Sequence, residues 1–490
     1  MESLPQIGPL HTDVVIVGNG PSALALSFML AGHRPYYDGT PLSNEFLNDR
    51  LVKDMEVSLV DKELEPLCEG LEGRSNNPVA LLFDNLFHPD ADLGLDNPSV
   101  IDWKHEEQTE IDHVVLGKTK AGGTWQKIDG TMQTISQNTW MELPNVPFRE
   151  WMAQNRRNSG VGEPMYGRAT IGDVKDYYLD YVKSQGLQRY FKDNYTVTSV
   201  QRVYHLRNAV DSESGEVEPC CRNVRRNHTH CWEVRGYHSV FDDQGQAISR
   251  QDFCYLAPHV VLAAGAYDIP NRLGVEGENR PFVTHSLGDF EKHLSSSALN
   301  TLSDPVLVVG AGLSAADAIL MAMESNVPVI HVFRRGPSDP SLIFSKLPST
   351  MYPEYHRIHS LMKGKETSEL YRPMARHNVI EILDHKVLVG TKKQDQMATF
   401  DISFAAIMIG SRADLGFLPR EGRHLGVVPK WPIDSKHNPI DVDVYSYQSA
   451  HEPQMFAMGP LVGDSFVRFG IGGALGIVNH LRKCHKKENL

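Results

Sequence analysis

Two stretches of the chain share one pattern, in which a short apolar run leads into glycines and then into a longer apolar run. The first covers residues 14–30 and reads VVIVGNGPSALALSFML, and the second covers residues 305–323 and reads PVLVVGAGLSAADAILMAM. The four apolar residues at 14–17 and at 306–309 predict a buried strand in each stretch. The apolar residues after the glycines, 23–30 and 313–323, are compatible with a helix. Each stretch therefore predicts a strand, a tight turn and a helix in succession.

The remaining apolar runs predict an α/β fold with two Rossmann-like dinucleotide-binding domains and mainly parallel sheets. We expect further strands over 55–60, 114–116, 197–203, 259–265, 327–333 and 400–409, a strand with a Gly-Pro turn over 454–464, and helices over 171–187 and 468–481. Two polar stretches, 33–54 and 211–230, interrupt this pattern, and we interpret them as inserted loops.

The first glycine turn has the spacing GxGxxA, which binds the pyrophosphate of a dinucleotide when it joins a strand to a helix. Gly18 would make the tight turn, and Gly20 has no Cβ, so a pyrophosphate can approach the backbone. Ala23 would let the helix pack closely on the strand. The helix N-terminus at Pro21 and Ser22 would present free N–H groups and the positive end of its dipole to phosphate. The plain alternative is a glycine turn without a ligand.

The second turn repeats these features with Gly310, Gly312, Ser314 and Ala315. The strand expected after its helix ends at Arg334-Arg335, and Arg334 follows Gly312 by 22 residues. An acid at this distance favours NAD, whereas arginines accommodate the 2′-phosphate of NADP. The second unit therefore predicts NADPH. A nicotinamide needs an acceptor for its hydride, so the first unit predicts a flavin dinucleotide, FAD.

The first unit also needs a ligand for its nucleotide ribose, which is typically an acid about 20 residues beyond the glycines. Asp61 follows the expected strand over 55–60, but it comes 41 residues after Gly20. We favour Asp61 as the ribose ligand, which requires 33–54 to be an insertion between the helix and this strand.

Three further glycine sites lie where a flat ring system would need bare backbone. Residues 122–125 read Gly-Gly-Thr-Trp, and they predict either a turn with a buried tryptophan or a loop on which a ring lies, edged by Trp125. Gly265 ends the strand over 259–265, and Gly459 begins a turn that ends at Asp464. The glycine-rich start of the last helix would aim N–H groups at a flavin edge.

Composition narrows the class of protein. The chain has 490 residues, 41% of them hydrophobic and 22% charged, with a net charge of −13, which argues against a general nucleic-acid binder. No apolar run reaches the roughly 18 residues of a membrane helix, and the N-terminus lacks the features of a secretory signal. The six cysteines form no CxxC pair, so we expect reduced thiols in the cytoplasm and no disulfide-reductase dithiol. A zinc site among the Cys and His residues of 220–231 is disfavoured by their spacing, and we expect no metal.

With these motifs in order, the chain resembles the class B flavin-dependent monooxygenases. The resemblance rests on the GNGPSA stretch at Gly18, the GGTW stretch at Gly122, the strand ending at Gly265, the GAGLSAAD stretch at Gly310 and the turn from Gly459 to Asp464. It implies that Gly122, Gly123, Thr124, Trp125 and Gly265 contact FAD, with Asp464 near the ribityl chain. It also implies insertion of one oxygen atom into a soft N or S nucleophile or a ketone, on a small molecule or a protein.

The chain is still more similar to the oxidative stress-induced growth inhibitor family of animals. Very similar stretches are GLEGRSNNPVALLFD from Gly70, DPVLVVGAGLSAADA from Asp304, YPEYHRIH from Tyr352, NPIDVD from Asn438 and AMGPLVGDSFVRF from Ala457. This resemblance implies NADPH-linked monooxygenase activity, restraint of proliferation, and roles in differentiation and in late cytokinesis at the midbody, with partners of that process.

One departure concerns the motif Phe-x-Gly-x-x-x-His-Ser that class B monooxygenases usually carry before the second fingerprint. His285 and Ser286 are in place, but the Phe-x-Gly part is absent. We find no side chain to assign as general acid or base, and Asn138, Trp140 and His285 remain candidates for contacts in the flavin pocket. The alternative to an oxygenase is a regulatory interaction protein on a retained flavoprotein scaffold. We expect the FAD domain over 1–289 and 413–490 and the NADPH domain over 290–412.

Overall fold

The computed structural model describes residues 8–128, 130, 132–156, 167–204, 230–242, 246–296, 299–391 and 396–488. The chain divides into two compact units, which are unit 1 (residues 1–266 and 413–490) and unit 2 (residues 267–412). These units meet at 266/267 and 412/413, and the sequence analysis placed its domain limits at 289/290 and 412/413.

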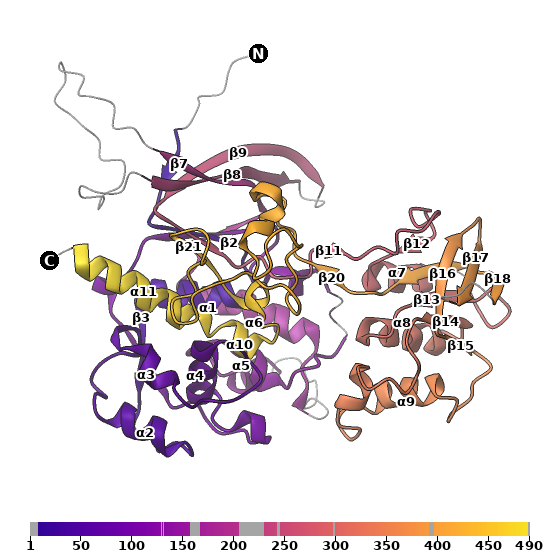
Figure 1. The fold of residues 1–490 in the computed structure, drawn as a ribbon, viewed down its shortest axis with the longest axis horizontal. Helices are drawn as coiled ribbons and strands as arrows, with labels where there is room; N and C mark the ends of the chain where they lie inside the picture. Colours follow the sequence, from indigo (N-terminus) through magenta and orange to yellow (C-terminus); the bar gives the residue numbers. More distant parts are fainter. Residues whose placement is uncertain are drawn as a thin grey trace, which may run out of the picture. The chain divides into compact units, whose positions relative to one another are not determined.

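Unit 1 is built on a five-stranded parallel sheet. Its strands, in spatial order, are β21 (Met455–Ala457), β10 (His259–Leu262), β2 (Val14–Val17), β5 (His113–Gly117) and β6 (Phe191–Asp193). The central strand β2 is fully buried, because its apolar residues contact helices as well as neighbouring strands. The helix α1 (Pro21–Leu30) follows β2 directly and packs against α11 (Gly473–Glu488), so the last helix of the chain lies beside the first (Figure 1).

Two smaller sheets and six more helices complete unit 1. The four-stranded sheet consists of β1 (Leu10–His11), β9 (Ala247–Ala257), β8 (His230–Phe241) and β7 (Tyr195–Tyr204), and β3 (His33–Tyr37) pairs with β4 (Ile101–His105). The helices are α2 (Glu45–Val52), α3 (Leu64–Cys68), α4 (Pro78–Phe87), α5 (Phe148–Arg156), α6 (Ile171–Ser184) and α10 (Val467–Gly470). The four-stranded sheet and the helices α2 to α4 lie on opposite sides of the unit (Figure 1).

Unit 2 repeats the same parallel architecture. Its strands, in spatial order, are β12 (Val283–Thr284), β19 (Phe404–Ile407), β13 (Val306–Val309), β14 (Val329–Phe333) and β15 (Tyr371–Ala375). The helices are α7 (Leu287–Ser296), α8 (Leu313–Glu324) and α9 (Pro353–Met362). An antiparallel sheet of β16 (His377–Ile382), β17 (Lys386–Thr391) and β18 (Met397–Asp401) and the pair β11 (Ile269–Pro270) and β20 (Ser411–Arg412) complete it.

Three predictions about elements are corrected by the structure. The stretch 33–54 is not a loop, since it forms β3 and α2, and the stretch 55–60 is not a strand, since it forms turns and part of the 3-10 helix Leu59–Asp61. The stretch 400–409 contributes to two strands, β18 and β19. The insertion expected at 211–230 lies outside the described residues, apart from His230 at the start of β8.

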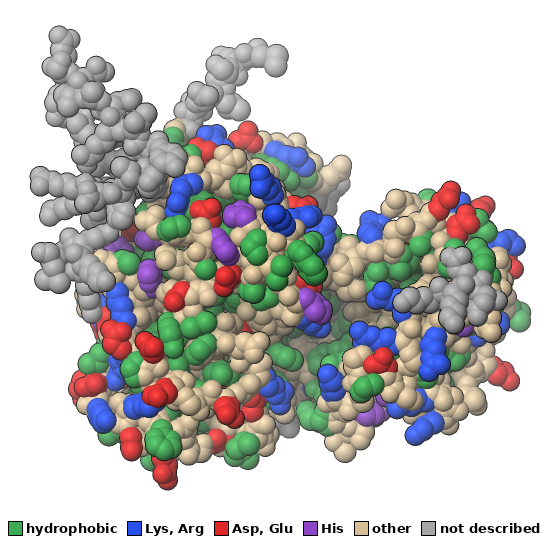
Figure 2. Space-filling model, in the orientation of Figure 1, with side chains coloured by type: hydrophobic (Ala, Val, Ile, Leu, Met, Phe, Trp, Pro, Cys, Tyr) green, Lys and Arg blue, Asp and Glu red, His purple; other side chains and the backbone are tan. Residues whose placement is uncertain are grey.

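The described surface carries charges of both signs. On the face shown in Figure 2, Lys and Arg side chains are interspersed with Asp and Glu side chains. Within the described ranges, none of the helices is both long enough and apolar enough to cross a bilayer.

Candidate dinucleotide-binding sites

The glycine turn of unit 1 has no room for a side chain at Gly18 but has open space at Gly20. Gly18 has φ +111°, and a Cβ on it would lie 2.3 Å from the carbonyl oxygen of Ala263, just beyond β10. A Cβ on Gly20 would meet nothing within 4 Å. Gly20 is the N-cap of α1, and no side chain caps the N–H groups of the first turn at this end. The turn therefore has the geometry that a pyrophosphate requires.

Two other glycine segments close around this turn. A Cβ on Gly123 would lie 3.1 Å from the Cα of Gly20, and the N–H of Gly122 donates to Asn19 O at 2.8 Å. On the other side, a Cβ on Gly459 would lie 2.5 Å from Ser22 Oγ. Of the FAD contacts predicted from sequence, the structure thus brings together 18–23, 122–123 and 459.

Three other residues were predicted to contact FAD, and they are Thr124, Trp125 and Gly265. Thr124 and Trp125 belong to the 3-10 helix Gly123–Lys127, and the Trp125 ring packs edge-on against Tyr178 at 6.4 Å between centroids. The Trp125 side chain is half-buried, so it is neither enclosed in the core nor fully exposed. Gly265 has φ +71°, and a Cβ on it would meet nothing within 4 Å.

Asp464 is buried under the C-terminal glycine turn. Its Oδ1 accepts a hydrogen bond from Ser75 Oγ at 2.5 Å, and its Oδ2 accepts one from Asn77 Nδ2 at 2.7 Å. Burial raises the pKa of Asp464 to about 7, although both hydrogen bonds act to lower it. Ser75 and Asn77 lie in the segment that separates α1 from β5, and sequence reasoning did not connect them with the site.

Asp61 does not occupy the position predicted for a ribose ligand. It follows no strand of the parallel sheet, and its carboxylate pairs with Arg34 and with Arg482 Nε, the latter at 3.1 Å. The strand next to β2 is β5, so the whole segment 31–112 is inserted between α1 and β5. The residue at the end of β5 is Lys118, whose Nζ lies 2.6 Å from Asp414 Oδ2. The sequence analysis did not consider Lys118, because it took residues 55–60 and not β5 as the strand that follows α1.

The turn of unit 2 has the same two-glycine construction. Gly310 has φ +136°, and a Cβ on it would lie 2.2 Å from the carbonyl oxygen of Met408, just beyond β19. A Cβ on Gly312 would meet nothing within 4 Å, and Gly312 is the N-cap of α8 without a side-chain cap. Ser314 is exposed at the start of α8, whereas Ala315 is buried against the turn.

A buried histidine makes a hydrogen bond to the backbone of this second turn. His331, on β14, lies within hydrogen-bond distance of Gly310 O through Nε2 (2.5 Å) and of Tyr371 Oη through Nδ1 (2.7 Å). A carbonyl can only accept, so Nε2 carries the proton and Nδ1 accepts from the tyrosine. Burial lowers the pKa of His331 to about 4, so the ring is neutral near pH 7.

Arg334 and Arg335 are exposed directly after β14. β14 lies beside β13 with Val332 opposite Val309, so the arginines leave the sheet at the edge where the glycine turn begins. Guanidinium groups at this edge suit the phosphate of an adenosine ribose.

Asn138 and Trp140 lie on the 3-10 helix Asn138–Met141 of unit 1. The Trp140 ring stacks under the guanidinium of Arg468 at 4.6 Å, and Arg468 is buried between the carboxylates of Asp84 (2.8 Å) and Asp92 (2.5 Å). Asn138 Oδ1 accepts from the Thr139 N–H at 2.7 Å. Trp140 therefore packs on a buried ion-pair cluster, and Asn138 bonds to the backbone of its own 3-10 helix.

His285 lies in unit 2 and makes a contact that the sequence did not reveal. Its Nε2 lies 2.9 Å from Oε1 of Glu278, and the Glu278 carboxylate also accepts from the N–H groups of Leu273 and Gly274. Burial alone would raise the pKa of Glu278, but these hydrogen bonds lower it below its usual value. His285 thus helps to hold the Glu278 carboxylate, which in turn binds the loop at Leu273 and Gly274.

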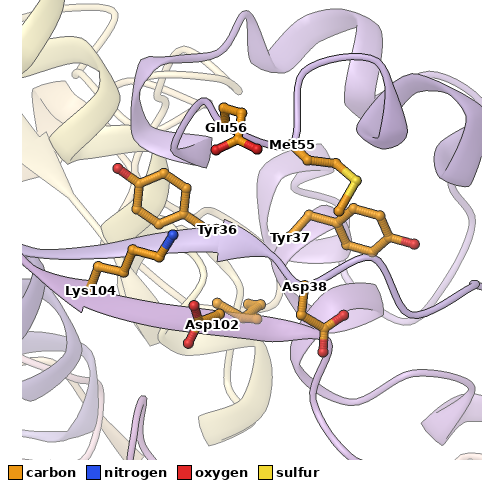
Figure 3. Close-up of a pocket in the computed structure, with 8 residues that line it drawn as sticks. Tyr36, Tyr37, Asp38, Met55, Glu56, Asp102 and Lys104 are labelled. Atoms are coloured by element: carbon orange, nitrogen blue, oxygen red, sulfur yellow. The ribbon is translucent and has the colours of Figure 1, made fainter.

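A surface hollow of about 390 Å³ lies beside the β3–β4 pair and includes no residue of either glycine turn. Lys104 Nζ lies 4.4 Å from the ring centre of Tyr36, with Glu56 and Asp102 nearby and Asp38 farther off, beside Tyr37 (Figure 3). Within the described part of the chain, no cluster of His, Cys, Asp and Glu has the arrangement of a metal site.

Known proteins resemble this chain in fold and in sequence. The family described as "Pyridine nucleotide-disulphide oxidoreductase" matches residues 238–427. The fold is similar to bacillithiol disulfide reductase Bdr of Staphylococcus aureus (TM-score 0.57, 13% identity, 97% of this chain and 99% of that chain). It is also similar to ornithine hydroxylase of Pseudomonas aeruginosa (TM-score 0.52, 11% identity, 97% of this chain and 99% of that chain). These likenesses show the fold, an α/β architecture shared with those two proteins.

The relatives in sequence are more specific. The chain is 43% identical to human oxidative stress-induced growth inhibitor 2 over 97% of this chain and 94% of the relative. It is 41% identical to human oxidative stress-induced growth inhibitor 1 over 97% of this chain and 96% of the relative. The chain therefore belongs to the oxidative stress-induced growth inhibitor family.

Proposed function

We propose that this protein is an NADPH-dependent, FAD-containing monooxygenase. The observation that carries the proposal is the paired construction of Gly18–Gly20 and Gly310–Gly312. In each pair the first glycine is closed by a backbone carbonyl of a neighbouring segment, and the second opens onto free space at a helix N-terminus. Two such turns in one chain suit an enzyme in which a nicotinamide serves a second ring system.

In unit 1, the chain's residues fit FAD. The N–H groups of Ser22 and Ala23 would bind the pyrophosphate, and the bare backbone at Gly122 and Gly123 would lie close to the cofactor. Asp464, whose carboxylate Ser75 and Asn77 hold in place, is proposed to face the ribityl chain.

In unit 2, the N–H groups at the start of α8 would bind the NADPH pyrophosphate. Arg334 and Arg335 would bind the 2′-phosphate, and His331 would keep the turn in shape. When bound, the two cofactors supply hydride transfer and oxygen activation, so one oxygen atom enters the substrate and the other leaves as water.

The proposed substrate is a soft N or S nucleophile or a ketone, on a small molecule or on a protein. The chain's own contribution would be positioning and exclusion of water, because Asn138, Trp140 and His285 are engaged in structural contacts. The relatives' name, growth inhibitor, supports a role in restraining proliferation. Cytoplasmic location stays a prediction from the cysteine pattern and the N-terminal sequence. Roles in differentiation and at the midbody with cytokinesis partners stay predictions from the family resemblance.

A dithiol mechanism does not fit the chain. The sequence contains no CxxC pair, which a dithiol reductase would need beside the flavin. Cys68 is buried, and burial raises the pKa of its thiol to about 12, which disfavours the reactive thiolate.

A second candidate is a regulatory protein that retains the cofactor scaffold with little turnover. The observation in its favour is that the Phe-x-Gly part of the motif before His285 is absent and that His285 is held by Glu278 at 2.9 Å.

The purified full-length chain distinguishes the two candidates. An oxygenase should show flavin absorption bands and consume NADPH in air, and a thioether or amine substrate should gain one oxygen atom by mass spectrometry. Flavin binding without NADPH consumption above the buffer rate would favour the regulatory protein. A colourless chain that FAD does not stabilise against heat would contradict the cofactor assignment itself.

A further inference from the structure

A third arginine lies beside the pair at the end of β14. The neighbouring strand β15 runs parallel to β14, and Phe333 pairs with Ala375 as the last residue pair of the two strands. The next residues are Arg334 and Arg376, so both leave the sheet at the same edge. Neighbouring strands are about 4.8 Å apart, which places the two backbones side by side.

The side chain of Arg376 points to the loop that carries the other two arginines. Its terminal nitrogen and Nε lie 3.3 Å and 3.4 Å from where a Cβ on Gly336 would be. Gly336 follows Arg335 directly, so its missing side chain leaves the space that the Arg376 guanidinium occupies.

The backbone of Arg376 is strained. Its φ of +60° lies in the left-handed region, which is unfavourable for a residue with a Cβ. Glycine or asparagine would adopt this conformation more easily. Strain of this kind is typical of functional positions.

The arginines lack close counter-charges. In the described parts of unit 2, no carboxylate oxygen lies within 4 Å of Arg334 or Arg376, whereas Arg357 pairs with Glu366 at 3.0 Å. Arg335 acts on the exposed Asp339, whose pKa is lowered first by Ser341 and in part by Arg335. Neighbouring cations without paired carboxylates are stabilised by a multivalent anion.

Building on the NADPH assignment above, we propose that Arg376 is a third ligand of the 2′-phosphate and a determinant of the preference for NADPH over NADH. Arg334 and Arg335 would hold the phosphate from β14, and Arg376 would hold it from β15. A fork of guanidinium nitrogens from each strand matches the three oxygens of a phosphate monoester.

The test is direct binding of 2′,5′-ADP and of 5′-AMP to the full-length chain by calorimetry, which requires neither flavin nor turnover. Arg376→Gln should weaken 2′,5′-ADP about tenfold or more and leave 5′-AMP within twofold. Arg372→Gln is the matched control, because Arg372 lies on the same strand, at the opposite end, and stacks on Phe400 at 4.6 Å. This control should bind both probes as the wild type does.

A second variant separates binding from folding. Arg376→Asn suits the left-handed backbone, so it should unfold at the same temperature as the wild type or higher while losing 2′,5′-ADP affinity. If Arg376→Gln and Arg376→Asn both keep wild-type affinity while Arg334→Gln loses it, the role of Arg376 is overturned and the NADPH assignment stands. If the wild type binds 2′,5′-ADP no more tightly than 5′-AMP, both proposals fail.

Discussion

His331 donates a hydrogen bond from Nε2 to the carbonyl oxygen of Gly310 at 2.5 Å, so a buried imidazole supports the turn that we propose binds the nucleotide. Replacing it by phenylalanine would keep a ring of similar size but leave Gly310 O and Tyr371 Oη without this partner. We expect His331→Phe to lower the free energy of unfolding of unit 2 by about 1–3 kcal/mol and to weaken NADPH binding. Urea unfolding and calorimetry measure the two effects. His356→Phe, which removes a bond from a half-buried ring to Leu347 O, should cost less, and an equal loss would contradict the special role of His331.

The stability of the protein should fall as the pH drops from about 6.5 to 4. Burial lowers the pKa of both His331 and His113 from 6.5 to about 4, so each ring is neutral in the folded state over a range in which the unfolded chain takes up a proton. The stability that these rings contribute is complete above pH 6.5 and is lost as the pH falls through 4, on the order of 3 kcal/mol for each ring. Unfolding free energies at several pH values measure the slope. The slope should be shallower in His331→Phe, and an unchanged slope would show that His331 does not titrate as proposed.

The two glycines of one turn should respond differently to alanine. In Gly312→Ala the new Cβ enters open space, so stability should stay within about 0.5 kcal/mol while NADPH affinity falls about tenfold or more. In Gly310→Ala the Cβ would collide with Met408 O, so the thermal unfolding temperature should drop. The pair Gly20→Ala and Gly18→Ala should behave likewise toward FAD. Retained NADPH affinity in Gly312→Ala would place the pyrophosphate elsewhere.

The cofactor preference should depend on the arginines after β14. The double variant Arg334→Gln with Arg335→Gln should bind NADPH about tenfold or more weakly, because charge-assisted hydrogen bonds to the 2′-phosphate are lost. NADH, which lacks this phosphate, should bind within twofold of its wild-type affinity. Arg357→Gln serves as the control, since its partner is Glu366. Equal losses for both dinucleotides would refute the 2′-phosphate assignment.

Flavin retention should depend on pH through Asp464. Burial raises its pKa from 3.8 to about 7, so the stability tied to the protonated carboxyl is complete below pH 3.8 and is lost as the pH rises through 7. Asn77→Leu removes a hydrogen bond that helps the ionised form, so it should reduce flavin content after gel filtration more at pH 8 than at pH 6. Asn479→Leu removes two hydrogen bonds to the carbonyls of Val60 and Lys62, away from this carboxylate, and should act equally at both pH values.

The sequence was most informative where one element follows the next directly along the chain. The strands at Val14 and Val306 and the helices after them carry their own periodicity and glycine spacing, and they are confirmed. It was least informative in 31–112. There the apolar stretch 55–60 forms turns and part of a 3-10 helix, and the polar stretch 33–37 forms β3. β3 pairs with β4, which begins 64 residues after β3 ends, and no local pattern announces so distant a partner.

The sites show the same limit. Arg334 could be predicted because it follows the glycine turn at a fixed distance on the next strand. Arg376 could not, because it joins the pair only through the register of β14 with β15. Ser75 and Asn77 likewise reach Asp464 across 389 and 387 residues of chain.

Unit 1 consists of two separate stretches of the chain, and this bears on the order in which the two units can fold during synthesis. Its sheet includes β21, and α11 packs on α1, so this unit cannot close until residues 455–488 have left the ribosome. Unit 2 consists of one continuous stretch, 267–412, and is complete earlier. Domains tend to fold as soon as their residues are available, and distant pairings form slowly. The emerging chain should therefore carry a folded unit 2 while unit 1 still lacks β21 and α11.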